Sequence, residues 1–364
     1  GYDPLPDVKQ MKTYIIAEIG INHNGSLDNC FKMIEAAVQA GCQAAKFQSF
    51  KSDRLYPKTA GKVRWKDQKG SPFEYDIYSA VKGFELPFEW IGELVAHCRR
   101  NHIDFISSVF DEPSLDLLIE AGMEKIKLAS STLTHIPLIR ACARTGLPVI
   151  LSTGGASLGE TEEAVNTLEQ YHTDISLLHC SLSYPTNPED CNLGVLNTLK
   201  TAFPDTKIGY SDHSLSVKEV PTAVVALGGS VIEKHITLDK TMEGPDHFFA
   251  LEPQELTAMV NAVRKAESLN PGKAPPIDKD LLGSSQKKCF PHEKYIRDFT
   301  YMSLFASRDI KKGEIIHAKD IRILRPGKKK RGLSPKHLDL FTKNRVTARI
   351  DIHKEDSIFW ESIL

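Results

Sequence analysis

Short apolar runs in this chain are followed, one after another, by residues that can act as acids, bases, ligands or hydrogen-bond donors. In chain order these are Glu18 with residues 22–25, Lys46 with Gln48, Ser107 and Ser108, Lys127 with Ser130, Ser152 and Thr153, His179 with Ser181 and Tyr184, residues 211–213, and residues 233–235. In a barrel of parallel strands, such positions meet at one rim, where the chemistry is placed. Lysines inside strands would otherwise lie buried without partners, at a high free-energy cost. The pattern therefore predicts one site built from many strand ends.

Two lysines are central to this site. Lys46 and Lys127 each lie among apolar residues. One interpretation is that they form salt bridges or extend their ammonium groups to solvent. The other is a convergent pair of cations, flanked by the hydroxyls of Ser130, Ser152 and Ser211. Such a set suits an anion that carries both phosphate and carboxylate groups.

Two histidines suggest a metal. His213 and His235 follow neighbouring predicted strands, which lie about 4.8 Å apart, so both imidazoles can reach one ion. Two imidazoles completed by water and substrate oxygens suit Mn²⁺, Fe²⁺, Co²⁺ or Zn²⁺. The alternative is a pair of structural histidines that are hydrogen-bonded to other groups. No HExxH or cysteine-rich zinc motif competes for the ion.

Three further residues have two interpretations each. Glu18 either pairs with one of the lysines or guides a water and relays a proton. Asp246, in the loop after the last predicted strand, either binds sugar hydroxyls or is solvated. Arg325 follows the apolar-rich run 321–324, so a strand end can present it, whereas the neighbouring run 328–331 is a solvated basic loop.

The elements that position these residues alternate regularly. Strand-like runs at 14–17, 44–47, 105–106, 126–128, 148–151, 175–178, 207–209 and 231–232 are each followed by a helical pattern. Ser157 and Glu160 form a capping box that opens one of these helices. Eight such units in a span near 250 residues predict a (β/α)8 TIM barrel. An open doubly wound sheet is the alternative, but no GxGxxG follows the first strand.

The predicted domains are an N-terminal arm at 1–12, a catalytic barrel at 13–269, a linker at 270–300 and a small β-rich domain at 301–364. The segment 50–86 is too long for an ordinary loop, so we expect it to form a lid or an insertion above the barrel. Within the last domain, short strands are expected around the glycine of 307–316, and a strand–turn–strand unit at 346–358.

Composition excludes several classes of protein. Among 364 residues, 46 basic and 47 acidic side chains give a net charge of −1, which gives no reason to expect a nucleic-acid or acidic-membrane binder. No apolar run approaches the roughly 20 residues that span a bilayer, and residues 1–12 lack the apolar core of a signal peptide. The seven cysteines are dispersed without a CxxC pair, which favours reduced thiols and a cytoplasmic location.

Several motifs together resemble the sialic acid synthase family. They are IIAEIGINHNGS at 15–26, KFQ at 46–48, LSTG at 151–154, YPT at 184–186, GYSDH at 209–213, IEKH at 232–235, GPDH at 244–247, DIKKG at 309–313 and RPG at 325–327. The match covers nearly the whole chain after Met11. Residues 281–285 and 296–299 are most similar to the spore coat polysaccharide branch of that family.

The resemblance implies an α/β fold, a TIM barrel followed by an antifreeze-like (SAF) domain, and a homodimer whose swapped C-terminal domain caps the partner's barrel. It implies condensation of phosphoenolpyruvate with an N-acetylated hexosamine to a nine-carbon 2-keto sugar acid and phosphate. It also implies a divalent metal on His213 and His235, Mn²⁺ foremost, with Mg²⁺, Co²⁺ or Fe²⁺ as alternatives.

The resemblance assigns roles residue by residue. The phosphoenolpyruvate groups are Lys46, Lys127, Ser130, Ser152 and Ser211, and we add Ser108 and Glu233 to the substrate-binding set. The sugar-side groups are Gln48, Tyr184 and Asp246. Arg325 reaches the N-acetyl group across the dimer. Glu18 is the catalytic glutamate that guides water, and His213 and His235 are catalytic through the metal, which would polarise the sugar aldehyde.

Two departures from the family pattern fall where the sugar is expected. Thr132 stands where the family often has an acidic residue, and Leu182 where many members have a polar one. The acceptor therefore stays open among N-acetylmannosamine, its 6-phosphate and di-N-acetylated sugars. Two other functions also stay open: a Schiff-base aldolase with Lys127 as nucleophile, and a non-catalytic sugar-binding protein.

Overall fold

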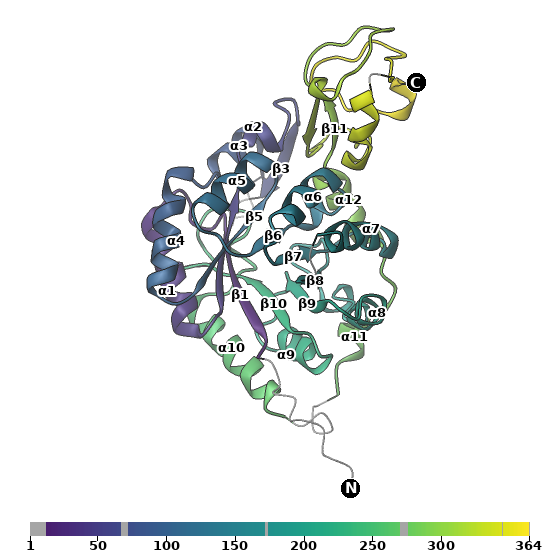
Figure 1. Ribbon diagram of the computed structural model, residues 1–364. Helices are drawn as coiled ribbons and strands as arrows, with labels where there is room; N and C mark the ends of the chain where they lie inside the picture. Colours follow the sequence, from purple (N-terminus) through teal and green to yellow (C-terminus); the bar gives the residue numbers. More distant parts are fainter. Residues whose placement is uncertain (1–11, 67–71, 172–173, 270–275, 344, 364) are drawn as a thin grey trace.

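The computed structural model describes residues 12–66, 72–171, 174–269, 276–343 and 345–363. Most of the predicted N-terminal arm and the first part of the predicted linker, 270–275, lie outside these residues. Eight parallel strands close into a barrel in the order β1-β10-β9-β8-β7-β6-β5-β2. Helices surround the barrel (Figure 1). This confirms the TIM-barrel prediction.

The barrel strands are β1 (Tyr14–Gly20), β2 (Ala44–Ser49), β5 (Asp104–Val109), β6 (Ile126–Leu128), β7 (Val149–Ser152), β8 (Ile175–His179), β9 (Lys207–Asp212) and β10 (Val231–His235). The helices that follow them are α1 (Leu27–Ala40), α4 (Ile91–Arg100), α5 (Glu112–Glu120), α6 (Ile136–Arg144), α7 (Leu158–Glu169), α8 (Val195–Ala202), α9 (Glu219–Ala226) and α10 (Pro253–Glu267). The capping box of Ser157 and Glu160 is present at the start of α7.

The core of the barrel domain lies mainly between strands and helices. Side chains such as Met33, Leu94, Leu138, Leu196 and Met259 are buried there. Each lies on the inward face of its helix, because apolar residues recur at helical spacing. Among the described residues, no helix is both long enough and apolar enough to cross a membrane.

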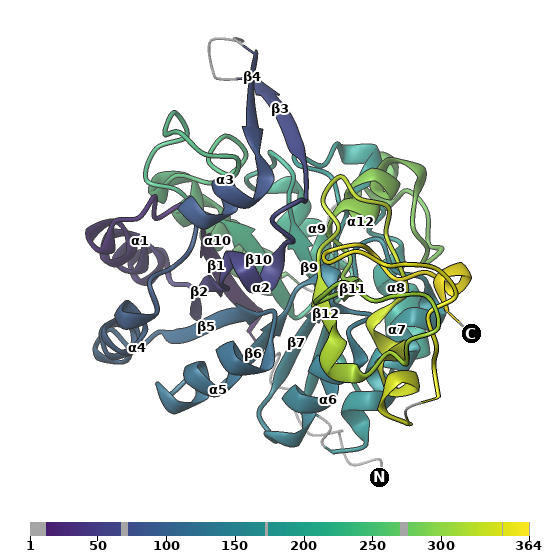
Figure 2. The same cartoon turned by 90° about the horizontal axis from the view of Figure 1, so that it is seen from above.

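The insertion between β2 and α4 is a helix–hairpin–helix unit. It contains α2 (Ser52–Leu55), the antiparallel pair β3 (Lys62–Lys66) and β4 (Pro72–Asp76), and α3 (Ile77–Gly83). Viewed along the barrel, the hairpin stands out from one side of the molecule (Figure 2). The C-terminal domain lies against α6 and α7 and also contacts the insertion, where Arg325 N donates to Leu55 O and Lys328 N to Ala60 O.

The connection to the C-terminal domain contains α11 (Lys279–Leu282) and α12 (Lys294–Thr300). The domain then pairs β11 (Ser303–Ala306) with β12 (Ile321–Leu324) in antiparallel fashion. Its own apolar core comprises Leu304, Ala306, Ile310, Ile316, Leu333, Phe341, Val346, Ala348, Ile352, Ile358 and Ile363.

The strands predicted at 307–316 and 346–358 do not form as continuous strands. These segments contribute single bridges instead, such as Ile310 with Ile352 and Ile315 with Thr347. The turn at Gly313, which has a positive φ, separates the two bridges, and further backbone bonds such as Ile316 N to Val346 O join the segments without a regular ladder. The domain is nevertheless built from extended segments, as predicted.

Candidate active site

A charged layer lies directly above an apolar layer inside the barrel. Ile16, Ala44, Ile106, Ile150, Leu178 and Val231 form a buried cluster of their own. Because side chains of a strand alternate between two faces, the residue two positions later points the same way. In the same order, those residues are Glu18, Lys46, Ser108, Ser152, Cys180 and Glu233. The strands thus bring most of the predicted groups to the carboxyl end of the barrel interior.

Lys46 joins both carboxylates of this layer. Its Nζ atom lies 2.7 Å from Glu18 Oε2 and 3.4 Å from Glu233 Oε1, and it donates to Ser108 Oγ at 3.2 Å. Gln48 Nε2 donates to Glu18 Oε1 at 2.7 Å. Glu18 therefore forms the salt bridge that one interpretation of the sequence predicted, inside the predicted site.

Lys127 approaches the same layer from β6. Its Nζ donates to Ser152 Oγ at 2.7 Å and lies 3.7 Å from Glu233 Oε2. Ser211 Oγ donates to Glu233 Oε1 at 3.4 Å. The two ammonium groups therefore converge on one carboxylate, with serine hydroxyls beside them.

Burial and mutual attraction set the charges of the layer. Burial raises the pKa of Glu18, against the attraction of Lys46. Burial also disfavours the charge of Glu233, but Lys127 and Lys46 outweigh it and lower the pKa of Glu233. Burial lowers the pKa of Lys127. The two carboxylates therefore differ in how readily they take up a proton, a pattern typical of acid–base sites.

His213 and His235 face each other beside this layer. Their ring centroids are 5.6 Å apart, and Phe249 packs edge-on against both rings. Nδ1 of His213 donates to the carbonyl oxygen of Ser181 at 2.9 Å. Burial lowers the pKa of both histidines, which favours the neutral imidazole.

The two imidazoles fit a divalent cation. His235 Nδ1 is buried without a hydrogen-bond partner, and the bond from His213 Nδ1 leaves Nε2 of that ring available. Neutral imidazole is a common metal ligand, and its second nitrogen is typically held by a carbonyl. Among the described residues, no group of three or more His, Cys, Asp or Glu side chains is arranged to hold a metal. The protein would therefore supply part of the coordination, and substrate or water the rest.

Tyr184 and Asp246 border the histidines. The ring centroids of Tyr184 and His213 are 4.3 Å apart, and Tyr184 is 41% exposed. Asp246 Oδ2 lies 3.8 Å from His235 Nδ1. Burial, together with the charge of Glu18, raises the pKa of Asp246 to about 7. Both residues are partly exposed and lie toward the outside of the site; their role as sugar-side groups stays a prediction.

Arg325 reaches the barrel of its own chain. Its Nη2 donates to Ser131 Oγ at 2.9 Å, and its guanidinium lies over the rings of Phe110 and Tyr56, 4.9 and 5.9 Å from their centroids. Its Nε atom is buried without a partner. The predicted reach of Arg325 across a dimer and the homodimer itself stay predictions.

Ser130 and the two departures from the family pattern lie around the loop after β7. Ser130 Oγ accepts from Gly154 N at 2.9 Å and lies 3.2 Å from Cys180 Sγ. Thr132 is fully buried and donates its hydroxyl to Ala129 O. Leu182 is 4% exposed, and its side chain packs against the glycines at 154 and 155. Thr132 therefore supplies no carboxylate, and Leu182 supplies no polar side chain, at the positions where the family often has them.

Some residues at the predicted strand ends point away from the barrel interior. Lys234 Nζ pairs with Asp212 Oδ2 at 2.8 Å and donates to Ser214 O. The Nε2 atom of His179 lies 3.1 Å from Cys191 O. These residues alternate with the inward-pointing ones, so they stabilise the packing of strands against helices.

Sequence reasoning missed three groups at the site: Cys180, Phe249 and Tyr75. Cys180 lies two residues after the interior Leu178. Phe249 follows Asp246 by three residues in the same loop. Burial raises the pKa of Tyr75, on β4, and the charges of Tyr56 and Asp246 add to this effect. Of the three, only Cys180 could have been found from the sequence, because it lies an even number of residues after an interior position of the same strand.

Comparisons with known proteins show the family of this chain. The NeuB family pattern matches residues 33–274 and the SAF domain pattern matches residues 301–364. The spore coat polysaccharide biosynthesis protein SpsE of Bacillus subtilis is 42% identical over 98% of this chain and 95% of its own length. Its crystal structure superposes with a TM-score of 0.85, covering 97% of this chain and 95% of that one.

Two other relatives carry the names of their products. The N,N'-diacetyllegionaminic acid synthase of Legionella pneumophila is 35% identical over 98% of this chain and 96% of its own length. The N-acetylneuraminate-9-phosphate synthase of Drosophila melanogaster is 35% identical over 85% of this chain and 86% of its own length. With the family pattern matched over most of the barrel and a relative this similar over nearly the full length, the chain belongs to the NeuB family, the family of the sialic acid-type synthases.

Proposed function

We propose that this chain condenses phosphoenolpyruvate with an open-chain N-acetylated hexosamine, forming a nine-carbon 2-keto sugar acid and phosphate. The observation that carries the proposal is the pair of buried lysines. Lys46 and Lys127 converge on Glu233 with Ser108, Ser152 and Ser211 hydroxyls beside them. Ammonium and hydroxyl donors arranged in this way can hold the phosphate and carboxylate of one small anion.

The bonds of the reaction balance without an added oxidant or reductant. Carbon 3 of phosphoenolpyruvate bonds to the aldehyde carbon of the sugar, and the aldehyde oxygen takes up a proton. Water adds to carbon 2, and the bond from carbon 2 to the phosphate oxygen breaks. The residues of the layer hold the two reactants together, and such positioning can contribute about 7–11 kcal/mol to catalysis.

Glu18 is the residue we propose to handle protons. It is 1% exposed, it accepts from Gln48, and its Oε2 atom contacts Lys46. A carboxylate held in this way can orient the water that attacks carbon 2 and accept its proton. Lys46 stabilises the negative charge of Glu18 before the proton is taken up.

A divalent cation on His213 and His235, with Mn²⁺ as the first candidate, belongs to this proposal. When bound, it would supply Lewis-acid polarisation of an oxygen at the sugar aldehyde. The chain itself contributes two neutral imidazoles and the aromatic wall of Phe249, which excludes water from one side. We also propose that Asp246, Tyr184 and Arg325 bind the acceptor sugar.

One observation favours the Schiff-base alternative. Burial lowers the pKa of Lys127, and a lysine with a lowered pKa is a better nucleophile. Its Nζ atom is, however, engaged by Ser152 and lies near Glu233. Borohydride treatment in the presence of substrate distinguishes the two: the condensation predicts no covalent adduct on Lys127.

The test of the proposal is phosphate release. Purified protein receives phosphoenolpyruvate, Mn²⁺ and, in turn, N-acetylmannosamine, its 6-phosphate, and di-N-acetylated trideoxyhexoses. At least one acceptor should release phosphate stoichiometrically with product. Lys127→Met should abolish release, whereas Lys207→Met, which removes an exposed pair with Asp174, should not. Absence of phosphate release with every acceptor would refute the proposal.

A further inference from the structure

The loop that follows Ser152 is buried and rich in glycine. Residues 153–156 are all buried, and Gly155 has a φ of +68°. Buried backbone N–H and C=O groups need hydrogen-bond partners. The barrel supplies Leu178 O for the Thr153 amide and Ser130 Oγ for the Gly154 amide. The Ala156 amide donates to Thr153 O at 3.1 Å, and the remaining carbonyl groups of the loop need other partners.

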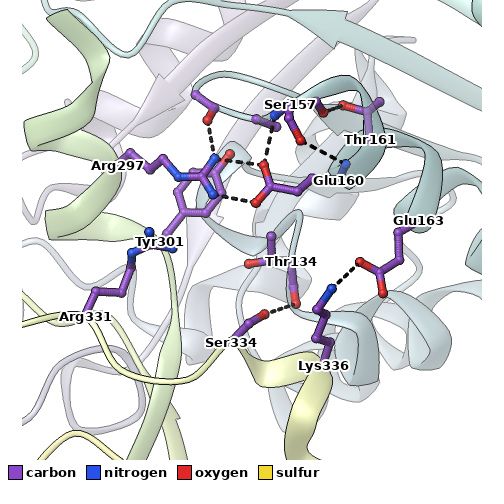
Figure 3. A network of polar contacts seen from close by, with 12 residues as sticks. Thr134, Ser157, Glu160, Thr161, Glu163, Arg297, Tyr301, Arg331, Ser334 and Lys336 are labelled. Atoms are coloured by element: carbon purple, nitrogen blue, oxygen red, sulfur yellow. Dashed lines mark hydrogen bonds and ion pairs between the residues drawn. The ribbon is translucent and has the colours of Figure 1, made fainter. Parts of the chain in front are cut away.

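Side chains from the segment 287–301 provide those partners. Lys287 Nζ donates to Thr153 O at 2.6 Å and to Ala156 O at 2.8 Å. The Tyr301 hydroxyl donates to Gly154 O at 2.6 Å. Arg297 donates to Gly155 O and is held by Glu160 of α7 (Figure 3). Every carbonyl of the loop therefore receives a donor from outside the barrel.

Glu293 connects this loop with the next one. Its Oε1 atom accepts from Gly155 N and from Leu182 N, both at 3.0 Å. Its Oε2 atom accepts from Phe290 N at 2.8 Å. The residue is 1% exposed. One buried carboxylate thus fixes the loops after β7 and β8 relative to each other.

The end of the segment holds the loop after β6. Met302 N donates to Ser131 O at 3.2 Å, next to Ser130. The segment therefore binds the loops that carry Ser130, Ser152 and Cys180, which are the groups on the Lys127 side of the charged layer. Apart from Met302 N, the groups that the segment contributes are the side chains of Lys287, Glu293, Arg297 and Tyr301, and hydrogen bonds of charged groups are the stronger kind.

We propose that the segment 287–302 is a positioning element of the anion site, acting through Lys287, Glu293, Arg297 and Tyr301. It holds the loops after β6, β7 and β8 so that Ser152 faces Lys127 and Ser130 stays beside Cys180. The identity of the anion rests on the function proposed above. None of these four side chains touches the reacting atoms, so each acts through the backbone that it binds. Displacement of a positioned group by about 1 Å can reduce a rate about 100-fold.

Tyr301→Phe is the mildest test, because it removes one hydroxyl and keeps the buried ring. Tyr14→Phe is its matched control, since the Tyr14 hydroxyl donates to Asp104 at the amino end of the barrel. Both variants should lose similar stability. Tyr301→Phe should raise the KM for phosphoenolpyruvate about 5-fold, the equivalent of one hydrogen bond, and leave the KM for the acceptor unchanged. If Tyr301→Phe and Tyr14→Phe had the same KM for phosphoenolpyruvate, the proposal would be overturned.

A second measurement needs no enzyme activity. In Glu293→Gln, hydrogen–deuterium exchange of the full-length protein should be at least 10-fold faster at the amides of Gly155 and Leu182 than in the wild type. The binding of inorganic phosphate, followed by calorimetry, should weaken about 10-fold in the same variant. Unchanged exchange and phosphate binding would overturn the positioning role. Failure of the proposed function would appear separately, as absence of phosphate release by the wild type.

Discussion

Lys46 Nζ lies 2.7 Å from Glu18 Oε2, and neither side chain exposes more than 3% of its surface. Two opposite charges are therefore held in contact where water cannot solvate them. Taking ions out of water is costly, and their mutual attraction offsets that cost only while both partners are present. Removal of either partner should therefore affect both the stability of the fold and the chemistry of the site.

Loss of one partner of this pair should destabilise the fold. Lys46→Met leaves Glu18 and Glu233 with one lysine fewer, and we expect the free energy of unfolding to fall by about 3 kcal/mol. Urea unfolding measures the change. Lys32→Met, which breaks an exposed pair with Asp28, should change it by less than about 0.5 kcal/mol. Equal losses in the two variants would contradict the burial argument.

Stability should depend on pH through His135. This residue caps α6 by accepting from Leu138 N, and burial lowers its pKa to about 4. The unfolded chain takes up this proton near pH 6.5, before the folded chain does. The free energy of unfolding should therefore be fully present above pH 6.5 and fall by roughly 1–2 kcal/mol on going from pH 7 to pH 5.

His135→Asn keeps a capping oxygen but no titrating ring. Its unfolding free energy should vary less between pH 7 and pH 5 than that of the wild type. His353→Asn, at a side chain that is 74% exposed, should retain the wild-type dependence. A His135→Asn variant with the unchanged dependence would show that the ring is not held neutral.

The metal assignment predicts loss of turnover when either imidazole is removed. His235→Ala should reduce phosphate release at least about 100-fold with Mn²⁺ present, and a chelator should inactivate the wild type reversibly. His179→Ala is the control, since this buried histidine points to Cys191 and away from the site. Full turnover in excess chelator would show that the assignment is wrong.

Gly209 has no room for a side chain. A Cβ at this position in β9 would lie 2.1 Å from Val231 O of the neighbouring strand. Gly209→Ala should therefore destabilise the barrel by about 3 kcal/mol or more, measured by thermal unfolding. Gly159→Ala, in α7 with no atom within 4 Å of the new Cβ, should instead stabilise by up to about 1 kcal/mol.

Arg325 allows a test of which barrel it completes. Because it contacts Ser131 of its own chain, an inactive Arg325→Ala variant and an inactive Lys127→Met variant should not restore activity when unfolded and refolded together. A domain-swapped homodimer would instead recover roughly a quarter of the activity, since mixed dimers would contain one intact site. Light scattering of the wild type gives the oligomeric state independently.

Much of the barrel could be predicted from strand–helix alternation, because both periodicities are local properties of the sequence. The site residues could be predicted for the same reason, because Glu18, Lys46 and Glu233 each lie two residues after an interior apolar position of their strand. Alternation also explains what sequence reasoning left unresolved. Lys234 is as polar as Glu233, but the opposite strand phase points it outward to Asp212.

The connection between the domains was far less predictable. Lys287 and Glu293 lie in a stretch without apolar periodicity, so nothing local indicates that both are buried. Their partners are backbone groups more than 100 residues earlier in the chain. Contacts of this kind depend on which backbone carbonyl groups the folded barrel leaves without partners. The local sequence pattern does not indicate those positions.

The apolar layer beneath the charged one has a consequence for the order of events. Ile16, Ala44, Ile106, Ile150, Leu178 and Val231 form a buried apolar cluster beneath the two lysines. Tyr184 and Asp246 lie toward the outside of the site. On the function proposed above, phosphoenolpyruvate therefore binds at the lysines before the acceptor sugar, and the product that joins the carbons of both leaves by the same route.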